Sequence, residues 1–186
     1  MPGIRVGHCT VKTEENHTGV TVIVPGPDTA FAKHYTAAAY IHNGFGKSAG
    51  VVQVEELGTL ETPIALTNTL NVGKVLDAMV EIVIEQCRKD GIEPQSINPV
   101  VGECNDCRIN HIQKRAIGDK EVREAFALAS EEFEEGDVGA GAGTTCYGMK
   151  GGIGSASRVI TIGEKEYTIG VLVQSNFGAT KDFVLN

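Results

Sequence analysis

Apolar and polar residues alternate with a period of two in several short segments, which predicts β-strands. The clearest is Gly19-Val20-Thr21-Val22-Ile23-Val24, which is rich in β-branched residues and ends at the turn sequence Pro25-Gly26-Pro27. Short apolar runs predict further buried strands, at residues 50–54, 63–67 and 98–102. Residues 158–162 and 167–173 flank Gly163-Glu164-Lys165-Glu166, and we expect them to form a β-hairpin.

A period of 3.6 residues replaces this alternation between Asn71 and Gly91, which predicts a helix with Asn71 as its N-cap and Gly91 at its end. Its apolar positions are Val72, Val75, Leu76, Met79, Val80, Val83, Ile84 and Cys87. Asp119 is expected to cap a second helix, whose solvated face carries the acidic run 131–135. The apolar face of that helix is formed by Val122, Ala125, Phe126, Ala129 and Phe133.

Strands and helices come in mixed order, which favours an α+β or layered α/β fold over a doubly wound parallel sheet. The length suits one domain with its own core, so we expect residues 1–186 to form a single domain. With 41% hydrophobic residues and a mean hydropathy of −0.05, the composition is that of a globular protein.

No apolar run approaches the roughly 20 residues of a membrane span, and no basic-then-apolar leader opens the chain. We therefore expect a cytoplasmic protein with no membrane partner. The net charge of −8 and the isoelectric point near 5.1 argue against a nucleic-acid partner.

Residues 136–158 form the most unusual segment, because eight glycines stand there among small hydroxyl residues. Glycine has no Cβ, so the backbone can adopt positive φ and approach a ligand or another strand closely. A flexible linker would carry more Ser, Pro or charge and would not run directly into a strand. We therefore predict a segment whose backbone has a defined shape and contributes to a site.

Two nucleotide-binding motifs can be rejected. Gly46-Lys47-Ser48 would need a glycine five positions before Gly46 to form a phosphate loop, and Ile41 stands there. The repeat at residues 139–143 lacks the last glycine of a dinucleotide fingerprint, and the residues before it read as helix rather than strand. We expect no cofactor.

The cysteines are expected to be thiols rather than a disulfide framework. Cys104-Asn105-Asp106-Cys107 together with His111 supplies at most three zinc ligands, and no second pair of cysteines completes the site. Two ordinary thiols and no metal are the prediction, with zinc or redox chemistry as the alternative.

No nucleophile is evident from the residues alone. Hydroxyl and thiol side chains occur in the glycine run, at Thr144, Thr145, Cys146, Ser155 and Ser157. None of them lies in a G-x-S-x-G elbow. Glu103 directly follows the apolar run 99–102, so it reads equally well as a functional carboxylate at a strand end or as a solvated one.

Six sequence blocks carry a resemblance to a known family. They are residues 3–8 (Gly-Ile-Arg-Val-Gly-His), 18–23 (Thr-Gly-Val-Thr-Val-Ile), 44–46 (Gly-Phe-Gly), 58–69, the glycine run through Ser157-Arg158, and 170–178. In this order they resemble the L-aminopeptidase/D-esterase family, which includes β-peptidyl aminopeptidases. The resemblance covers nearly the whole chain.

This resemblance implies a self-processing hydrolase with an N-terminal nucleophile and a layered α/β/β/α sandwich fold. Such precursors cut themselves into a longer α subunit and a shorter β subunit, whose new first residue, usually Ser, is the nucleophile. A free α-amine has a pKa of about 8, so it can serve as the base for its own hydroxyl. Nothing in this chain resembles the nucleophile segment, which lies beyond residues 170–178 in the family.

The resemblance therefore implies that residues 1–186 are the α subunit or a fragment of one. The implied partners are a β subunit that carries the nucleophile and a higher-order oligomer of αβ units. The implied substrate is a short peptide, amide or ester with a free amino end.

Three site residues follow from the same resemblance. Asn176 matches the asparagine whose side-chain amide lines the oxyanion hole, and Glu103 matches the acidic residue that receives the substrate amino group. Asn105 stands where the family often has Tyr, and we include it among the substrate-binding residues; the second oxyanion donor stays open. No metal site is implied.

Two other functions stay open. An acyltransferase of the related ornithine-acetyltransferase type would pass the acyl group to an amine, and a non-catalytic assembly subunit would need no nucleophile. Glu103 favours the peptidase, because its carboxylate offers a partner for a substrate ammonium.

Overall fold

The structure is a computed structural model that describes residues 2–27 and 29–184. Its main sheet consists of β1 (Ile4–Lys12), β2 (His17–Pro25), β5 (Ile64–Asn68) and β6 (Val100–Cys104), in the order β1-β2-β5-β6. The pairs β1-β2 and β2-β5 are antiparallel, whereas β5 and β6 are parallel. The strands predicted at residues 19–24 and 63–67 are confirmed, and the mixed sheet agrees with the predicted α+β class.

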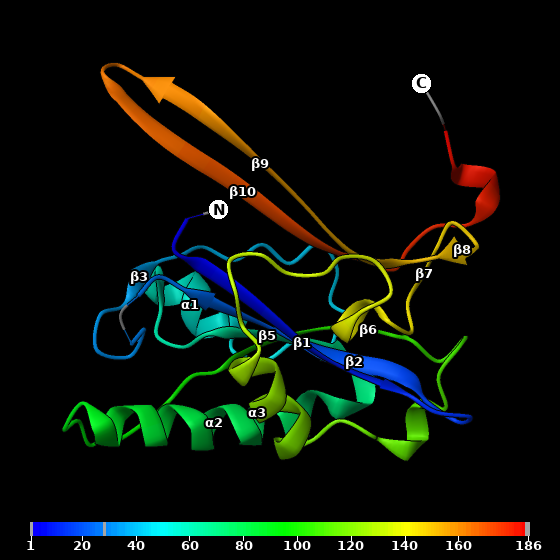
Figure 1. Ribbon diagram of the computed structural model, residues 1–186, viewed down its shortest axis with the longest axis horizontal. Coiled ribbons are helices and arrows are strands. Elements are labelled where there is room, and N and C mark those ends of the chain that lie inside the picture. The colour runs from blue at the N-terminus through cyan, green and yellow to red at the C-terminus, as the bar shows by residue number, and fades with distance from the viewer. Residues whose placement is uncertain (1, 28, 185–186) are drawn as a thin grey trace.

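Two helices cover one face of this sheet (Figure 1). The longer one, α2 (Val72–Lys89), connects β5 to β6 and so forms the crossover that a parallel pair requires. The shorter one, α3 (Asp119–Ala127), packs against α2, β1 and β2. A Cβ on Gly7 of β1 would lie 1.9 Å from the carbonyl oxygen of Ala125, so only glycine allows α3 to come this close.

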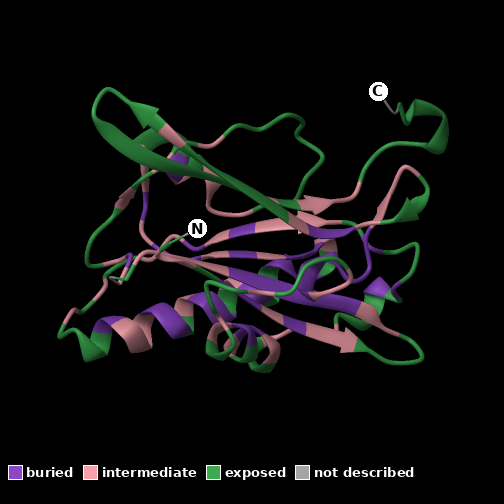
Figure 2. Cartoon of the chain, turned by 45° about the horizontal axis from the view of Figure 1, so that its top comes forward, coloured by how far each residue is buried: buried purple, intermediate pink, exposed green. Residues whose placement is uncertain are grey.

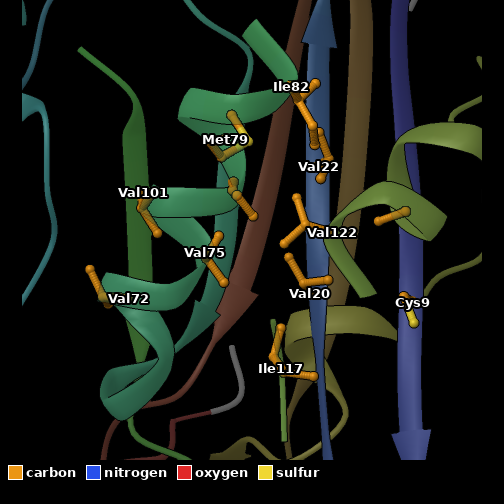
Figure 3. Packing of buried hydrophobic residues seen from close by; sticks show 13 residues of the cluster. Cys9, Val20, Val22, Val72, Val75, Met79, Ile82, Val101, Ile117 and Val122 are labelled. Atoms are coloured by element: carbon orange, nitrogen blue, oxygen red, sulfur yellow. The ribbon is translucent and has the colours of Figure 1, made fainter. Parts of the chain in front are cut away.

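The hydrophobic core lies between these helices and the sheet (Figure 3). Val75 and Met79 of α2 belong to one buried cluster with Val20 and Val22 of β2 and Val101 of β6. All five side chains are fully buried, and each contributes about 1.5–3 kcal/mol by leaving water. The helix predicted from the 3.6-residue period is confirmed, and its apolar stripe faces the sheet.

A long hairpin lies on the opposite side of the sheet and rises away from the body (Figure 1). It consists of β9 (Gly152–Ile162) and β10 (Lys165–Ser175), which pair antiparallel along their whole length. Most of its residues are exposed, in contrast to those of the main sheet (Figure 2). The predicted hairpin is confirmed, and its strands are longer than predicted.

Shorter elements connect these parts. They are α1 (Val51–Leu57), β3 (Tyr35–Thr36), β4 (Thr59–Leu60), β7 (Thr145–Cys146), β8 (Met149–Lys150) and the 3-10 helices η1 (Thr69–Asn71), η2 (Ile112–Lys114), η3 (Gly139–Gly141) and η4 (Thr180–Asp182). Within the described residues, no helix is both long enough and apolar enough to cross a bilayer.

The strand predicted at residues 50–54 is wrong, because α1 begins at Val51. Gly50 precedes this helix with a φ of 80°, in the left-handed region that favours glycine. Only Val54 of the helix is buried, whereas Val52 is 73% exposed. A short apolar run shows no decisive period, so it fits a helical turn as well as a buried strand.

The ends of the helices also differ from the predictions. Gly118, not Asp119, is the N-cap of α3, and its backbone N–H donates to Glu121 Oε2 at 3.0 Å. The helix ends before residues 129–135, so these lie in the following loop rather than on its faces. Asn71 is the N-cap of α2 as predicted, but its side chain makes no capping hydrogen bond.

The strand predicted at residues 98–102 begins two residues later, after Pro99. Proline has no backbone N–H to donate to a neighbouring strand, which explains the later start. This shift moves Glu103 inside β6, where it stands opposite Thr67 of β5.

Candidate active site

The glycine run lays its backbone directly on β1 and β2. The backbone N–H of Gly139 donates to Thr10 Oγ1 at 2.7 Å, and that of Ala140 donates to Thr21 Oγ1 at 3.0 Å. A Cβ on Gly19 would lie 2.3 Å from the carbonyl oxygen of Gly139, so this approach requires glycine in β2. The run therefore has a defined backbone shape, as predicted. It includes β7, whose Thr145 lies next to the residue that follows the hairpin, Asn176.

Asn176 follows β10 directly and joins three segments of the chain. Its Oδ1 accepts a hydrogen bond from the backbone N–H of Thr145 at 3.1 Å. Its Nδ2 donates to the carbonyl oxygen of Asn105 at 3.0 Å. A side-chain amide has two N–H donors, so one is left to point elsewhere. The structure thus brings together two of the three predicted site residues.

A cavity of about 290 Å³ lies beside this amide. Its lining includes Asn105, Cys107, Arg108, Thr145, Asn176 and Phe177. The side chain of Asn105 is exposed; its Oδ1 accepts from the backbone N–H of Cys107 at 3.0 Å. Polar groups with hydrogen-bonding capacity therefore face a space large enough for a small substrate group.

Glu103 is held by two neutral donors on other segments. The backbone N–H of Lys47 donates to its Oε1 at 2.9 Å, and Thr69 Oγ1 donates to its Oε2. The Lys47 ammonium instead lies 3.8 Å from the centre of the Phe45 ring. Among the described residues, no cation forms an ion pair with Glu103, although its carboxylate is fixed and half-buried. Glu103 is therefore held more firmly than a solvated carboxylate at a sheet edge, and its negative charge can pair with a cationic ligand.

Asp106 was not predicted from the sequence, where the flanking cysteines were considered as functional residues instead. Its side chain is only 2% exposed. Thr18 Oγ1 donates to its Oδ2 at 2.6 Å, and Asn110 Nδ2 donates to its Oδ1 at 3.0 Å. Burial raises the pKa of Asp106, while these two hydrogen bonds act in the opposite direction. The buried carboxylate anchors the loop that carries Asn105 to the start of β2.

The two cysteines of this loop are in different surroundings. Cys107 is exposed, whereas Cys104 is partly buried and donates to the carbonyl oxygen of Gln174 at 3.8 Å. Burial, with the charges of Glu103 and Asp106, raises the pKa of the Cys104 thiol to about 11. A thiol with a raised pKa is a poor nucleophile and metal ligand at neutral pH. In residues 2–27 and 29–184, no three His, Cys, Asp or Glu side chains are grouped to hold a metal ion; the expected absence of metal stays a prediction.

Among the described residues, none of the hydroxyl candidates of the glycine run is hydrogen-bonded to a histidine. Thr144 is buried and donates to the carbonyl oxygen of Gly141 at 2.9 Å, and Ser155 donates to Glu135 on the surface. In the part of the chain that the structure describes, the hydroxyl hydrogen-bonded to a histidine is Thr21, which bonds to His8 and is fully buried. The described residues therefore contain a candidate oxyanion amide and a candidate ammonium site, but no hydroxyl of the glycine run that is paired with a histidine base.

Comparison with known proteins identifies the family. Residues 1–186, the whole chain, match the family model described as Peptidase family S58. The chain belongs to this peptidase family. It is 36% identical over 192 residues to the beta-peptidyl aminopeptidase BapA of Sphingosinicella xenopeptidilytica, with 98% of this chain and 47% of the relative covered. The chain thus spans about half the length of the curated relatives it matches.

Solved structures of similar proteins share this fold. The PH0078 protein from Pyrococcus horikoshii OT3 is 42% identical, with a TM-score of 0.92 over 97% of this chain and 54% of its own. The L-aminopeptidase D-Ala-esterase/amidase from Ochrobactrum anthropi is 30% identical, with a TM-score of 0.86 over 96% of this chain and 52% of its own. That enzyme is described as a prototype for the serine aminopeptidases and a new variant of the Ntn-hydrolase fold. The predicted fold class is confirmed.

Proposed function

We propose that this chain is the α-subunit part of a self-processing aminopeptidase or amidase that acts on short substrates with a free amino end. The observation that carries the proposal is the Asn176 amide, which is fixed by hydrogen bonds at both of its ends and borders a polar cavity. Membership of Peptidase family S58 supports the reaction class. The nucleophile would come from a segment that this chain does not contain.

In this proposal each site residue has one task. The free N–H of Asn176 would donate to the oxygen of the substrate carbonyl as negative charge develops on it. Asn105 lines the same cavity, and its exposed amide would orient the substrate there. Glu103 would bind the substrate ammonium, because its carboxylate is fixed by Thr69 and Lys47 without a cation of its own.

The hairpin supports the proposed β-subunit partner. Every second residue of β10 from 167 to 173 is apolar and about half exposed, so one face of the strand carries a continuous apolar stripe. A cavity of about 300 Å³ separates the hairpin from the sheet, and its lining includes Val6, Ile23, Ile64, Phe133, Val171 and Leu172. Apolar surface of this extent needs a cover. We propose that the segment present in the longer relatives provides it and that such αβ units assemble into a higher-order oligomer.

The test uses the full-length gene product. We expect mass spectrometry to find two fragments, the second beginning with Ser, Thr or Cys. We also expect the protein to release the amine from an aminoacyl p-nitroanilide whose amino group is free, but not from the N-acetyl derivative of the same substrate. Glu103→Gln should lower kcat/KM for the substrate with a free amino group by about 10- to 100-fold, the scale of one charge-assisted hydrogen bond. Glu56→Gln, which removes the same charge from an exposed position of α1, serves as the control.

The alternatives predict different results. The acyltransferase would transfer the acyl group to an added amine in preference to water, and the assembly subunit would show neither cleavage nor turnover. An uncleaved and inactive full-length protein would overturn the proposed function.

A further inference from the structure

The guanidinium of Arg108 is a cation of the Asn176 cavity that the proposed reaction does not yet use. Arg108 is exposed and lines this cavity together with Asn105 and Asn176. Within residues 2–27 and 29–184, it forms no hydrogen bond or ion pair. Arg123, by contrast, is held by Glu85 and Asp119. Arg108 is therefore an unpaired charge at a candidate site.

The backbone that carries Arg108 is firmly anchored. The backbone N–H groups of Ile109 and Asn110 donate to the carbonyl oxygen of Asp106 at 3.1 and 3.0 Å, which closes a turn around Arg108. The buried side chain of Asp106 is in turn bonded to Thr18 and Asn110. Arg108 thus lies in a turn whose position is set by a buried network.

The facing wall of the cavity is fixed as well. The ring of Phe177 lies 4.9 Å from that of Tyr147 in an edge-on arrangement. The carbonyl oxygen of Phe177 accepts from the backbone N–H of Tyr147 at 2.8 Å. A Cβ on Gly178 would lie 2.5 Å from the Tyr147 ring, so the chain turns here in close contact with it. Arg108 therefore lines a cavity whose wall at Phe177 is held in place.

A guanidinium in such a place suits one class of ligand. Its planar set of N–H donors matches the two oxygens of a carboxylate, and the charge strengthens both hydrogen bonds. We propose that Arg108 binds the free carboxylate at the C-terminal end of a short peptide substrate and so selects peptides over amides and esters that lack this group. The inference rests on the proposed function, because it assumes that the scissile carbonyl lies at Asn176.

The spacing along the chain limits the length of such a substrate. Arg108 comes five positions after Glu103, so their Cα atoms can lie at most about 18 Å apart even in an extended chain. The turn after Asp106 shortens this distance further. A peptide whose amino end meets Glu103 and whose carboxylate meets Arg108 is therefore only a few residues long. The two charges would therefore favour zwitterionic di- and tripeptides as substrates.

The experiment compares alanyl-alanine with its C-terminal amide as substrates of the full-length gene product. Arg108→Gln should lower kcat/KM for the free acid by about 10- to 100-fold, mainly through KM, and change that for the amide less than threefold. Arg108→Lys should give an intermediate loss, because it keeps the charge but not the paired donors. Arg88→Gln, an exposed position at the end of α2, controls for net charge.

The outcomes separate the two proposals. Retained turnover of the amide shows that the variant is folded and assembled, so a selective loss on the free acid supports the inference. Equal loss on both substrates, or none on either, overturns it while the proposed function stands. If the free acid is unaffected but an amide with an aspartyl leaving group is, Arg108 reads side chains instead and the inference is wrong. A wild-type enzyme that cleaves neither substrate overturns both proposals.

Discussion

Val22 of β2 and Val171 of β10 are both valines within antiparallel strands, but Val22 is fully buried and Val171 is 56% exposed. Val22 lies beneath α2 and α3 in the main cluster (Figure 3). The β9–β10 hairpin has no helix layer over its outer face and projects from the body (Figures 1 and 2). The same residue type in the same local structure therefore occupies two opposite environments.

This contrast separates what strand pairing requires from what burial requires. A hairpin closes by local hydrogen bonds around a short turn, here with Gly163 at a φ of 63°. Burial of an apolar face needs a second layer, which α2 and α3 supply to the main sheet. The described part of the chain supplies none to the outer face of the hairpin. The site residues Asn105 and Asn176 lie where the hairpin returns to the body.

The largest effect is expected from placing a charge in each region. Val22→Asp should lower the free energy of unfolding by more than about 4 kcal/mol, because it buries an unpaired carboxylate. Val171→Asp should leave the helix-backed core intact but weaken the contact of the hairpin with the proposed β subunit. Hydrogen exchange of the full-length product checks this: α2 amides lose protection only in Val22→Asp. Equal loss of α2 protection in both variants would contradict the comparison.

The next effect concerns the junction of the two regions. Asn176→Ala should slow turnover by about 100- to 1,000-fold, the scale for one oxyanion donor, and should slow self-cleavage as well. Asn98→Ala is the matched control, because the Asn98 side-chain amide bonds to the Gly50 carbonyl and does not line the cavity. The measurement is kcat/KM per folded active site alongside Tm. A lower Tm with normal turnover would remove Asn176 from the catalytic residues.

The smallest effect distinguishes a paired carboxylate of the body from an unpaired one of the hairpin. Asp137 lies 2.8 Å from Lys12 Nζ, 2.9 Å from His17 Nε2 and 3.2 Å from Lys150 Nζ. Although partial burial opposes ionisation, these hydrogen bonds hold the pKa of Asp137 well below its usual range. The pairs are partly exposed, so Asp137→Asn should cost no more than about 1 kcal/mol at pH 7.

The pH dependence has a definite sign. An acid with a depressed pKa in the folded state stabilises it above the unfolded pKa, near 4 for Asp. The difference between wild type and Asp137→Asn should therefore be constant above about pH 5 and shrink as the pH falls below 4. Glu164→Gln in the hairpin turn should leave the free energy of unfolding unchanged both above about pH 5 and below about pH 4. Denaturant unfolding at several pH values checks this, and a difference that grows in acid would contradict it.

Periodicity predicted the parts of the fold that local sequence controls. The i, i+3, i+4 pattern in residues 72–87 predicts α2, because a helix that buries one face must repeat its apolar residues at that spacing. The alternation in β2 has the same kind of cause. Residues 50–54 show no clear period. The N-cap of α1, Gly50, lies in close contact with Pro99, and the sequence does not reveal this contact.

The site was less predictable than the fold. Resemblance named Glu103, Asn105 and Asn176, yet only the structure showed that Asn176 bonds to the backbone of Asn105 over a sequence separation of 71. Asp106 and Arg108 were not predicted, because the burial of one acid and the lack of a partner for one cation leave no signature in the sequence. Their roles depend on neighbours in β2 and in the segment after β10, which are distant in the chain.

The sequence by itself determined the order and type of the main elements and the hairpin turn, because each follows from local conformational preference. Only the tertiary structure decided that β2 is covered and β10 is not, and that the loop after β6 meets the end of the hairpin. Burial and long-range hydrogen bonds are properties of pairs of segments. No single stretch of residues can therefore specify them alone.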